Sequence, residues 1–148
     1  MTGAVLAAVR EYWGWTGIDA EAVTAVSPFG HLIVRDRAGA FWYLDPEIRT
    51  LACIAQDEPG LFAYMAQPDV RELWLAEALV ERAKAAIGAP PDEDRCYALS
   101  IARLLAGDYS ADDFWHPPVA ELIGVMGDIE ARTRGLPDGT EVQLKIVD

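Results

Sequence analysis

The chain has 148 residues, of which 12 are basic and 24 are acidic, so its formal net charge is −12. This length favours a single domain over residues 1–148, with a core large enough to fold without disulfide bonds. A negative surface repels phosphate backbones and attracts basic proteins. The charge therefore argues against direct nucleic-acid binding and is compatible with a basic protein partner, although many proteins are acidic for solubility alone.

The first segment of the chain has the apolar pattern of an amphipathic helix. Its apolar residues recur every three or four positions, at Val5, Leu6, Val9 and Trp13. Gly14 follows, where a glycine commonly ends a helix, so we expect a helix over residues 2–13. Asp19 can act as an N-cap, and we expect a second, short helix from Asp19 to Val26.

The segment from Pro28 to Pro46 has the sequence of a β-hairpin. Two runs rich in β-branched and aromatic residues, 31–35 and 41–44, flank residues 36–39, whose glycine can adopt the positive φ of a short loop. Alternation makes one face of the first run apolar throughout and the other face mixed. The second run is apolar on both faces, which predicts a central strand that is covered on both sides.

Three elements are expected between the hairpin and the middle of the chain. Residues 50–55, with the sequence TLACIA, have the length and apolarity of a further strand in a meander. A small helix is expected between residues 57 and 68, which begin with an acidic turn and end at a proline. Asp69 and Glu72 have the spacing of a capping box, so we expect the longest helix to run from about 70 to 87 and to cover a face of the sheet.

The C-terminal half combines weaker strand patterns with one clear helix. Residues 96–101 alternate weakly as a strand, and residues 104–109 are expected to form an irregular connection. A helix is predicted near 118–134, and residues 140–147 alternate cleanly as a half-buried strand. We therefore predict an α+β fold in which an antiparallel sheet of about five strands, including the C-terminal one, is covered by the helices near 70–87 and 118–134.

The sequence contains none of the common catalytic motifs. It has no phosphate-binding glycine loop, HExxH, GxSxG or CxxC pair, and only His31 and His116 could serve as the base of a serine or cysteine triad. Asp112, Asp113 and His116 could hold a divalent metal if a loop folded them together. Adjacent carboxylates in an acidic protein are far more often solvated. We therefore expect no enzyme, no metal and no cofactor, and a small metal-dependent hydrolase is the weakest alternative.

Cysteine usage and hydropathy favour an intracellular location. Cys53 and Cys96 lie far apart without metal-ligand spacing, so we expect both to be buried, reduced thiols. No basic segment follows Met1, and no apolar run reaches the roughly 18 residues of a membrane span. These features predict a cytoplasmic protein that does not insert into a membrane.

Several short segments occur in the order that is typical of one protein family. They are WGWTGI at 13–18, FGHLIV at 29–34, GAFW at 39–42, GDI at 127–129 and LPDG at 136–139. Together they resemble the C-terminal domain, formerly of unknown function, of bacterial immunity proteins that protect type VI secreting bacteria from their own DNase effectors. The resemblance extends over most of the chain. It implies a non-enzymatic inhibitor that binds a cognate toxin, a nuclease above all, and blocks its active site or substrate groove.

The candidate partner-binding surface combines acidic and aromatic residues of the second half of the chain. Its members are Asp92, Glu93, Asp94, Asp108, Tyr109, Asp112, Asp113 and Trp115. Aromatic anchors supply most of the energy of an interface, whereas the surrounding charges set approach rate and selectivity. Trp115 fits a core position equally well. The alternative function is an acidic regulatory or scaffold module that binds a protein other than a toxin, and the sequence does not indicate an oligomeric state.

Overall fold

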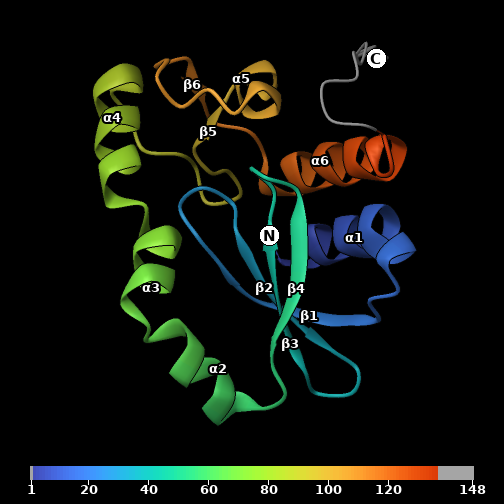
Figure 1. Cartoon of the computed structure of the whole chain (residues 1–148). Helices are drawn as coiled ribbons and strands as arrows, with labels where there is room; N and C mark the ends of the chain where they lie inside the picture. Colours follow the sequence, from blue (N-terminus) through green and yellow to red (C-terminus); the bar gives the residue numbers. More distant parts are fainter. Residues whose placement is uncertain (1, 137–148) are drawn as a thin grey trace.

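A computed structural model describes residues 2–136 and has an α+β fold (Figure 1). Its strands are β1 (Ala20–Val26), β2 (Leu32–Asp36), β3 (Phe41–Asp45), β4 (Thr50–Ala55), β5 (Ala98–Leu99) and β6 (Phe114–Trp115). Its helices are α1 (Thr2–Trp13), the 3₁₀ turn η1 (Gly14–Thr16), α2 (Glu58–Met65), α3 (Pro68–Leu75), α4 (Glu77–Ile87), α5 (Ile101–Ala106) and α6 (Val119–Thr133). None of these helices is long and apolar enough to cross a membrane. The strand expected over 140–147 lies outside the described residues.

The first four strands form an antiparallel meander in the order β1-β2-β3-β4, which confirms the predicted hairpin and its central strand. Asp36 closes the hairpin loop. Its carboxylate accepts hydrogen bonds from the backbone N–H groups of Ala38 (3.0 Å) and Ala40 (2.9 Å) and from the indole of Trp42 (2.9 Å). The Trp42 hydrogen bond is the main reason why the pKa of Asp36 is lowered. Gly39 supplies the positive φ of 92° that the loop requires.

Residues 20–26 form a strand, and the short helix predicted from Asp19 to Val26 is wrong. The sequence AEAVTAV contains three β-branched residues, and its backbone pairs with β2, with Val23 opposite Val34. Asp19 does not cap a helix, because its carboxylate pairs with Arg37 of the hairpin loop at 2.9 Å. Non-local pairing with the hairpin therefore determines the conformation of this segment.

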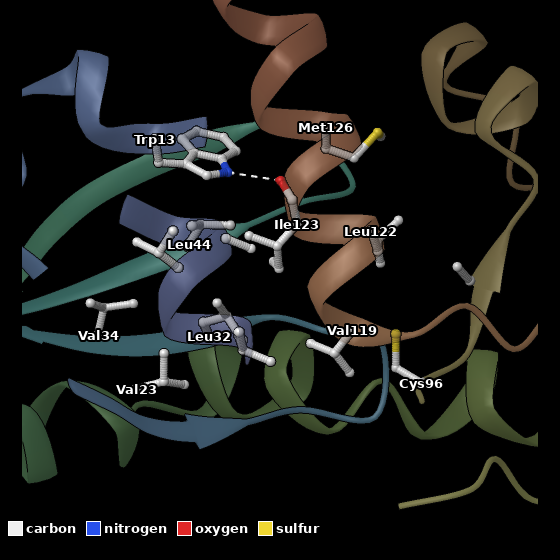
Figure 2. Close-up of a cluster of buried hydrophobic side chains, with 14 of the residues drawn as sticks. Trp13, Val23, Leu32, Val34, Leu44, Cys96, Val119, Leu122, Ile123 and Met126 are labelled. Carbon is white, nitrogen blue, oxygen red and sulfur yellow. Dashed lines mark hydrogen bonds between the residues drawn. The ribbon is translucent and has the colours of Figure 1, made fainter. Parts of the chain in front are cut away.

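The main core lies between one face of the sheet and the helices α1 and α6, which lie side by side (Figure 1). The sheet contributes Val23, Leu32, Val34 and Leu44, and α6 contributes Val119, Leu122, Ile123 and Met126 (Figure 2). Trp13 of α1 is 1% exposed, and its indole N–H donates to the Ile123 carbonyl at 3.0 Å. This bond satisfies the one polar atom of the buried ring. The two helices predicted near 2–13 and 118–134 are confirmed.

The opposite face of the sheet is covered by α2 and α3, whereas α4 lies beyond the sheet (Figure 1). The predicted continuous helix over 70–87 is wrong, because Ala76 adopts a left-handed conformation (φ 46°) and separates α3 from α4. The break lets Trp74 pack edge-on against Tyr43 while α4 turns toward Phe29. A left-handed non-glycine residue costs about 1–3 kcal/mol, which the separate contacts of the two helices must offset.

Two smaller predictions also require correction. The capping box at the start of α3 does not form: Gln67 is the N-cap residue, without a side-chain hydrogen bond, and Pro68 occupies the first turn. The strand predicted over 96–101 is reduced to β5, and the expected irregular connection at 104–109 begins within helix α5. The sequence IARLLA of α5 consists of good helix formers.

Candidate functional site

A buried polar cluster lies at the base of the hairpin and centres on His31, which is 2% exposed. Leu32 pairs with Leu44, so the antiparallel register places His31 opposite Asp45. The imidazole Nδ1 lies 2.6 Å from the Tyr43 hydroxyl, and Nε2 lies 2.9 Å from a Glu47 carboxylate oxygen. A neutral ring satisfies both contacts when Nε2–H donates to Glu47 and Nδ1 accepts from Tyr43. Both ring nitrogens of His31 are therefore engaged in internal hydrogen bonds.

Glu47 is held by a second donor from a distant part of the chain. The Tyr109 hydroxyl donates to the other carboxylate oxygen of Glu47 at 3.1 Å. Burial, together with the nearby carboxylates, raises the pKa of both Tyr43 and Tyr109, so both phenols stay protonated and able to donate. Burial also raises the pKa of Asp45, against the opposing effect of His31 at 3.4 Å. The cluster thus fixes the position of Glu47 between His31 and Tyr109.

Glu47 also lines an open cavity of about 810 Å³ where α3 meets α4, which we call the α3–α4 cleft. The cleft has the size of a small-ligand or side-chain pocket. Its charged lining residues are Glu47, Asp69, Arg71, Glu72 and Glu77, and its large apolar lining residues are Leu73, Leu75 and Leu79. The cleft therefore presents apolar surface beside an excess of carboxylates.

Three carboxylates of the α3–α4 cleft have no cationic partner in the described part of the chain. Asp69, Glu72 and Glu77 are exposed, and none of the ion pairs among residues 2–136 includes them. Leu73, which lies beside them, is 51% exposed although it is a large apolar residue. Together with the partly exposed Leu75 and Leu79, it gives the cleft an apolar side next to its carboxylates.

Three acids of the predicted partner-binding surface are engaged in internal ion pairs. Asp112 pairs with Arg82 of α4 at 2.9 Å. Asp108 and Asp113 both pair with Arg103 of α5, at 3.0 Å and 3.3 Å. These contacts tie the segment before β6 to the neighbouring helices, and they partly neutralise the negative charge that a basic partner would meet.

The remaining members of that surface differ in exposure. Asp92, Glu93 and Asp94 are exposed on the loop between α4 and β5 and are absent from the ion pairs of the described residues. The hydroxyl of Tyr109 points to Glu47, as described above. Trp115 is 36% exposed, and its indole N–H donates to the Leu99 carbonyl at 3.2 Å. The structure thus brings residues 108–115 together around α5 and β6, with the 92–94 loop as a separate exposed acidic segment.

The candidate metal ligands do not converge. Asp112 and Asp113 face Arg82 and Arg103, and the His116 ring packs against Tyr97 with centroids 5.3 Å apart. Within residues 2–136, no group of three His, Cys, Asp or Glu side chains is placed to hold a metal ion.

The two cysteines are free thiols in different environments. Cys96 is buried as predicted, and burial raises its pKa to about 12. Cys53 is exposed, contrary to the prediction, because β4 is an edge strand of the sheet.

Comparison of the chain with protein-family models, curated proteins and solved structures finds no match. The resemblance to immunity proteins therefore remains a prediction, based on the sequence segments given above.

The sequence contains a signal for the buried polar cluster around His31, although the sequence analysis did not predict this cluster. Alternation places His31 on the same face as Ile33, which is buried, and a histidine on a covered face requires hydrogen-bond partners. The hairpin register then points to Asp45 and, two residues later, to Glu47. The α3–α4 cleft carried no comparable signal, since it depends on the break at Ala76.

Proposed function

We propose that this protein is a non-enzymatic inhibitor that binds a basic toxin and blocks its active site or substrate groove. The observation that best supports this proposal is the α3–α4 cleft, in which exposed apolar surface lies beside three carboxylates that form no ion pair within residues 2–136. Such a site suits a partner that supplies both apolar contacts and positive charge. Reversible protein binding requires no reacting group, and His31 is committed to internal hydrogen bonds.

A nuclease is the class of toxin that this charge fits best. Nucleases bind phosphate backbones through lysine and arginine, and an acidic protein competes for those same side chains. The net charge of −12 also accelerates the approach of a basic protein. The resemblance to immunity proteins of type VI DNase effectors implies the same pairing, and in this proposal the inhibitor acts in the cytoplasm of the cell that makes the toxin.

Co-expression with a candidate toxin tests the proposed function. An immunity gene normally lies beside the gene of its toxin, so genomic context supplies the candidate. The toxin should arrest growth when produced alone, and the full chain should restore growth and co-purify with a catalytically inactive toxin variant. A toxin from an unrelated pair serves as the control. If growth stays arrested and no complex forms with the inactive variant, the immunity function is wrong, and a regulatory or scaffold role becomes the better explanation.

A further inference from the structure

The α3–α4 cleft is an open hollow of about 810 Å³, and its lining is uneven in charge. Four carboxylates line it against one guanidinium, that of Arg71, so it carries an excess of three negative charges. The acidic 92–94 loop has a similar charge but lies outside this hollow. The cleft thus adds shape and apolar contact to charge, and these are the features that distinguish a docking site from a solvated acidic loop.

We propose that the α3–α4 cleft receives an arginine of a protein partner, together with an apolar side chain adjacent to that arginine. This inference rests on the proposed function, because it assigns the partner's contact to a particular site. Asp69, Glu72 and Glu77 meet the guanidinium, and Leu73 meets the apolar neighbour. Glu47, whose position is fixed by His31 and Tyr109, forms part of the inner wall.

Two properties of the guanidinium group suit this cleft better than the ammonium group of lysine does. A guanidinium is more weakly hydrated than an ammonium and loses less on entering a partly apolar cavity. It also presents several N–H donors in a plane, so it can contact carboxylates from more than one wall at the same time. Asp69 and Glu72 belong to α3, whereas Glu77 begins α4, so the acceptors do belong to two separate elements. A compact ammonium group would reach fewer of them.

Peptide titration of the ¹⁵N-labelled full chain tests the site without the toxin. The probe is a capped pentapeptide of alternating leucine and arginine, used at about 50 mM salt, where screening of surface charges is weak. We expect saturable shifts of amide signals in residues 68–79. A peptide with lysine in place of arginine should bind more weakly, and one with glutamate should produce no saturable shifts. Equal binding of the arginine and lysine peptides, or shifts confined to the 92–94 loop, would refute the assignment.

Charge-matched variants separate the cleft from general acidity. Asp69→Asn/Glu72→Gln/Glu77→Gln and Asp92→Asn/Glu93→Gln/Asp94→Asn each remove three negative charges, so each changes the net charge from −12 to −9. The cleft variant should lose about tenfold or more in affinity for the arginine peptide, whereas the loop variant should lose about twofold at most. All six positions are exposed, so both variants should retain the melting temperature of the parent chain.

A second matched pair tests the apolar part of the site. Leu73 is 51% exposed and lines the cleft, whereas Phe62 is 68% exposed on α2 and lies outside it. Leu73→Ser should weaken peptide binding, and Phe62→Ser should leave it unchanged. Equal effects of the two substitutions would show that exposed apolar surface in general, and not the cleft, binds the peptide.

The same variants distinguish failure of this inference from failure of the proposed function. If the toxin binds the cleft variant as tightly as the parent chain, the cleft assignment is wrong and the immunity function stands. If the arginine peptide binds in the cleft but co-expression shows no protection and no complex, the cleft assignment stands and the immunity function is wrong.

Discussion

The contact between α1 and α6 yields the sharpest stability prediction, because it depends on the absence of a single carbon atom. Gly127 lies where α6 crosses the end of α1. A Cβ at this position would lie 2.5 Å from the Trp13 indole nitrogen and 2.8 Å from the backbone oxygen of Tyr12. Real Cβ atoms do not approach other atoms this closely, so Gly127→Ala must push the two helices apart or displace the indole.

The expected cost follows from the contacts that this displacement disturbs. Overpacking of a core costs about 1–3 kcal/mol. Loss of the 3.0 Å bond from Trp13 to the Ile123 carbonyl leaves a buried donor unsatisfied, at a further cost of about 1–3 kcal/mol. Alanine recovers about 1 kcal/mol through its better helix propensity. The free energy of unfolding should therefore fall by about 2–4 kcal/mol, and the melting temperature by roughly 5–15 °C for a chain of this size.

Gly124→Ala is the matched control on the same helix. A Cβ at Gly124 would lie 3.0 Å from ring carbons of Tyr12, a partly exposed side chain that can move aside. This substitution should be close to neutral, because the gain in helix propensity offsets the adjustment of the ring. Urea unfolding followed by tryptophan fluorescence measures both variants. Equal stability of Gly127→Ala and Gly124→Ala would refute the packing argument.

Three further predictions concern the buried polar cluster and the surface charge. His31→Ala should lower the unfolding free energy by about 1–3 kcal/mol in urea titration, because it removes the 2.9 Å hydrogen-bond partner of the buried Glu47 carboxylate; an unchanged midpoint would contradict this. Burial raises the pKa of Asp45 in the folded state, so folding favours the protonated carboxyl; its contribution to stability is complete below the unfolded value of 3.8 and is lost as the pH rises through the folded pKa. Relative to Asp45→Asn, the parent chain should therefore lose stability as the pH rises from 3.8, and a parallel pair of pH–stability curves would be inconsistent with this. Association with a basic toxin should slow steeply between about 50 and 500 mM salt, with little change in dissociation rate, whereas a salt-independent rate in stopped-flow mixing would reject electrostatic steering.

The sequence predicted those elements whose signals are local. The hairpin combines alternating β-formers with a loop that Asp36 and Gly39 close by themselves, and α1 and α6 have apolar residues at helical spacing. The strand β1 was missed because Asp19 resembles a helix cap. The Asp19 carboxylate instead pairs with Arg37, which lies 18 positions further along the chain. Local patterns therefore failed where a long-range contact satisfied a polar group that was expected to act locally.

The break at Ala76 has the same kind of explanation. Residues around it are good helix formers, so propensity favours one continuous helix. Two separate packing sites override that preference: Trp74 packs on Tyr43 of the sheet, and Val80 packs in the cluster that contains Phe29. Neither target can be read from the sequence of the helices, and for this reason the cleft between them could not be predicted.

The sequence predicted which acidic residues belong to the candidate partner-binding surface, but it did not predict their ion pairs with arginines. Sequence alone placed Asp108, Asp112 and Asp113 on exposed loops, but the fold determines that Arg82 and Arg103 reach them. Asp92 to Asp94 stay exposed, as expected for a loop between a helix and a strand. Formal charge along a sequence therefore overestimates the negative potential around residues 108–113.

The two faces of the sheet allow stability and binding to be tested separately. The face toward α1 and α6 carries the main core, in which Gly127 and Trp13 leave no room for an added atom. The α3–α4 cleft lies at the other side of the molecule, and its carboxylates are exposed. Substitutions at Gly127 should therefore change the unfolding free energy without altering affinity once the chain is folded, whereas substitutions at Glu72 or Glu77 should do the reverse. Substitutions at distant sites with no shared partners have additive effects. In a double variant, the change in unfolding free energy and the change in binding free energy should therefore each equal the sum of the single-variant changes within about 0.5 kcal/mol. A larger coupling would mean that α3 and α4 depend on the α1–α6 core, and that the cleft is not an independent site.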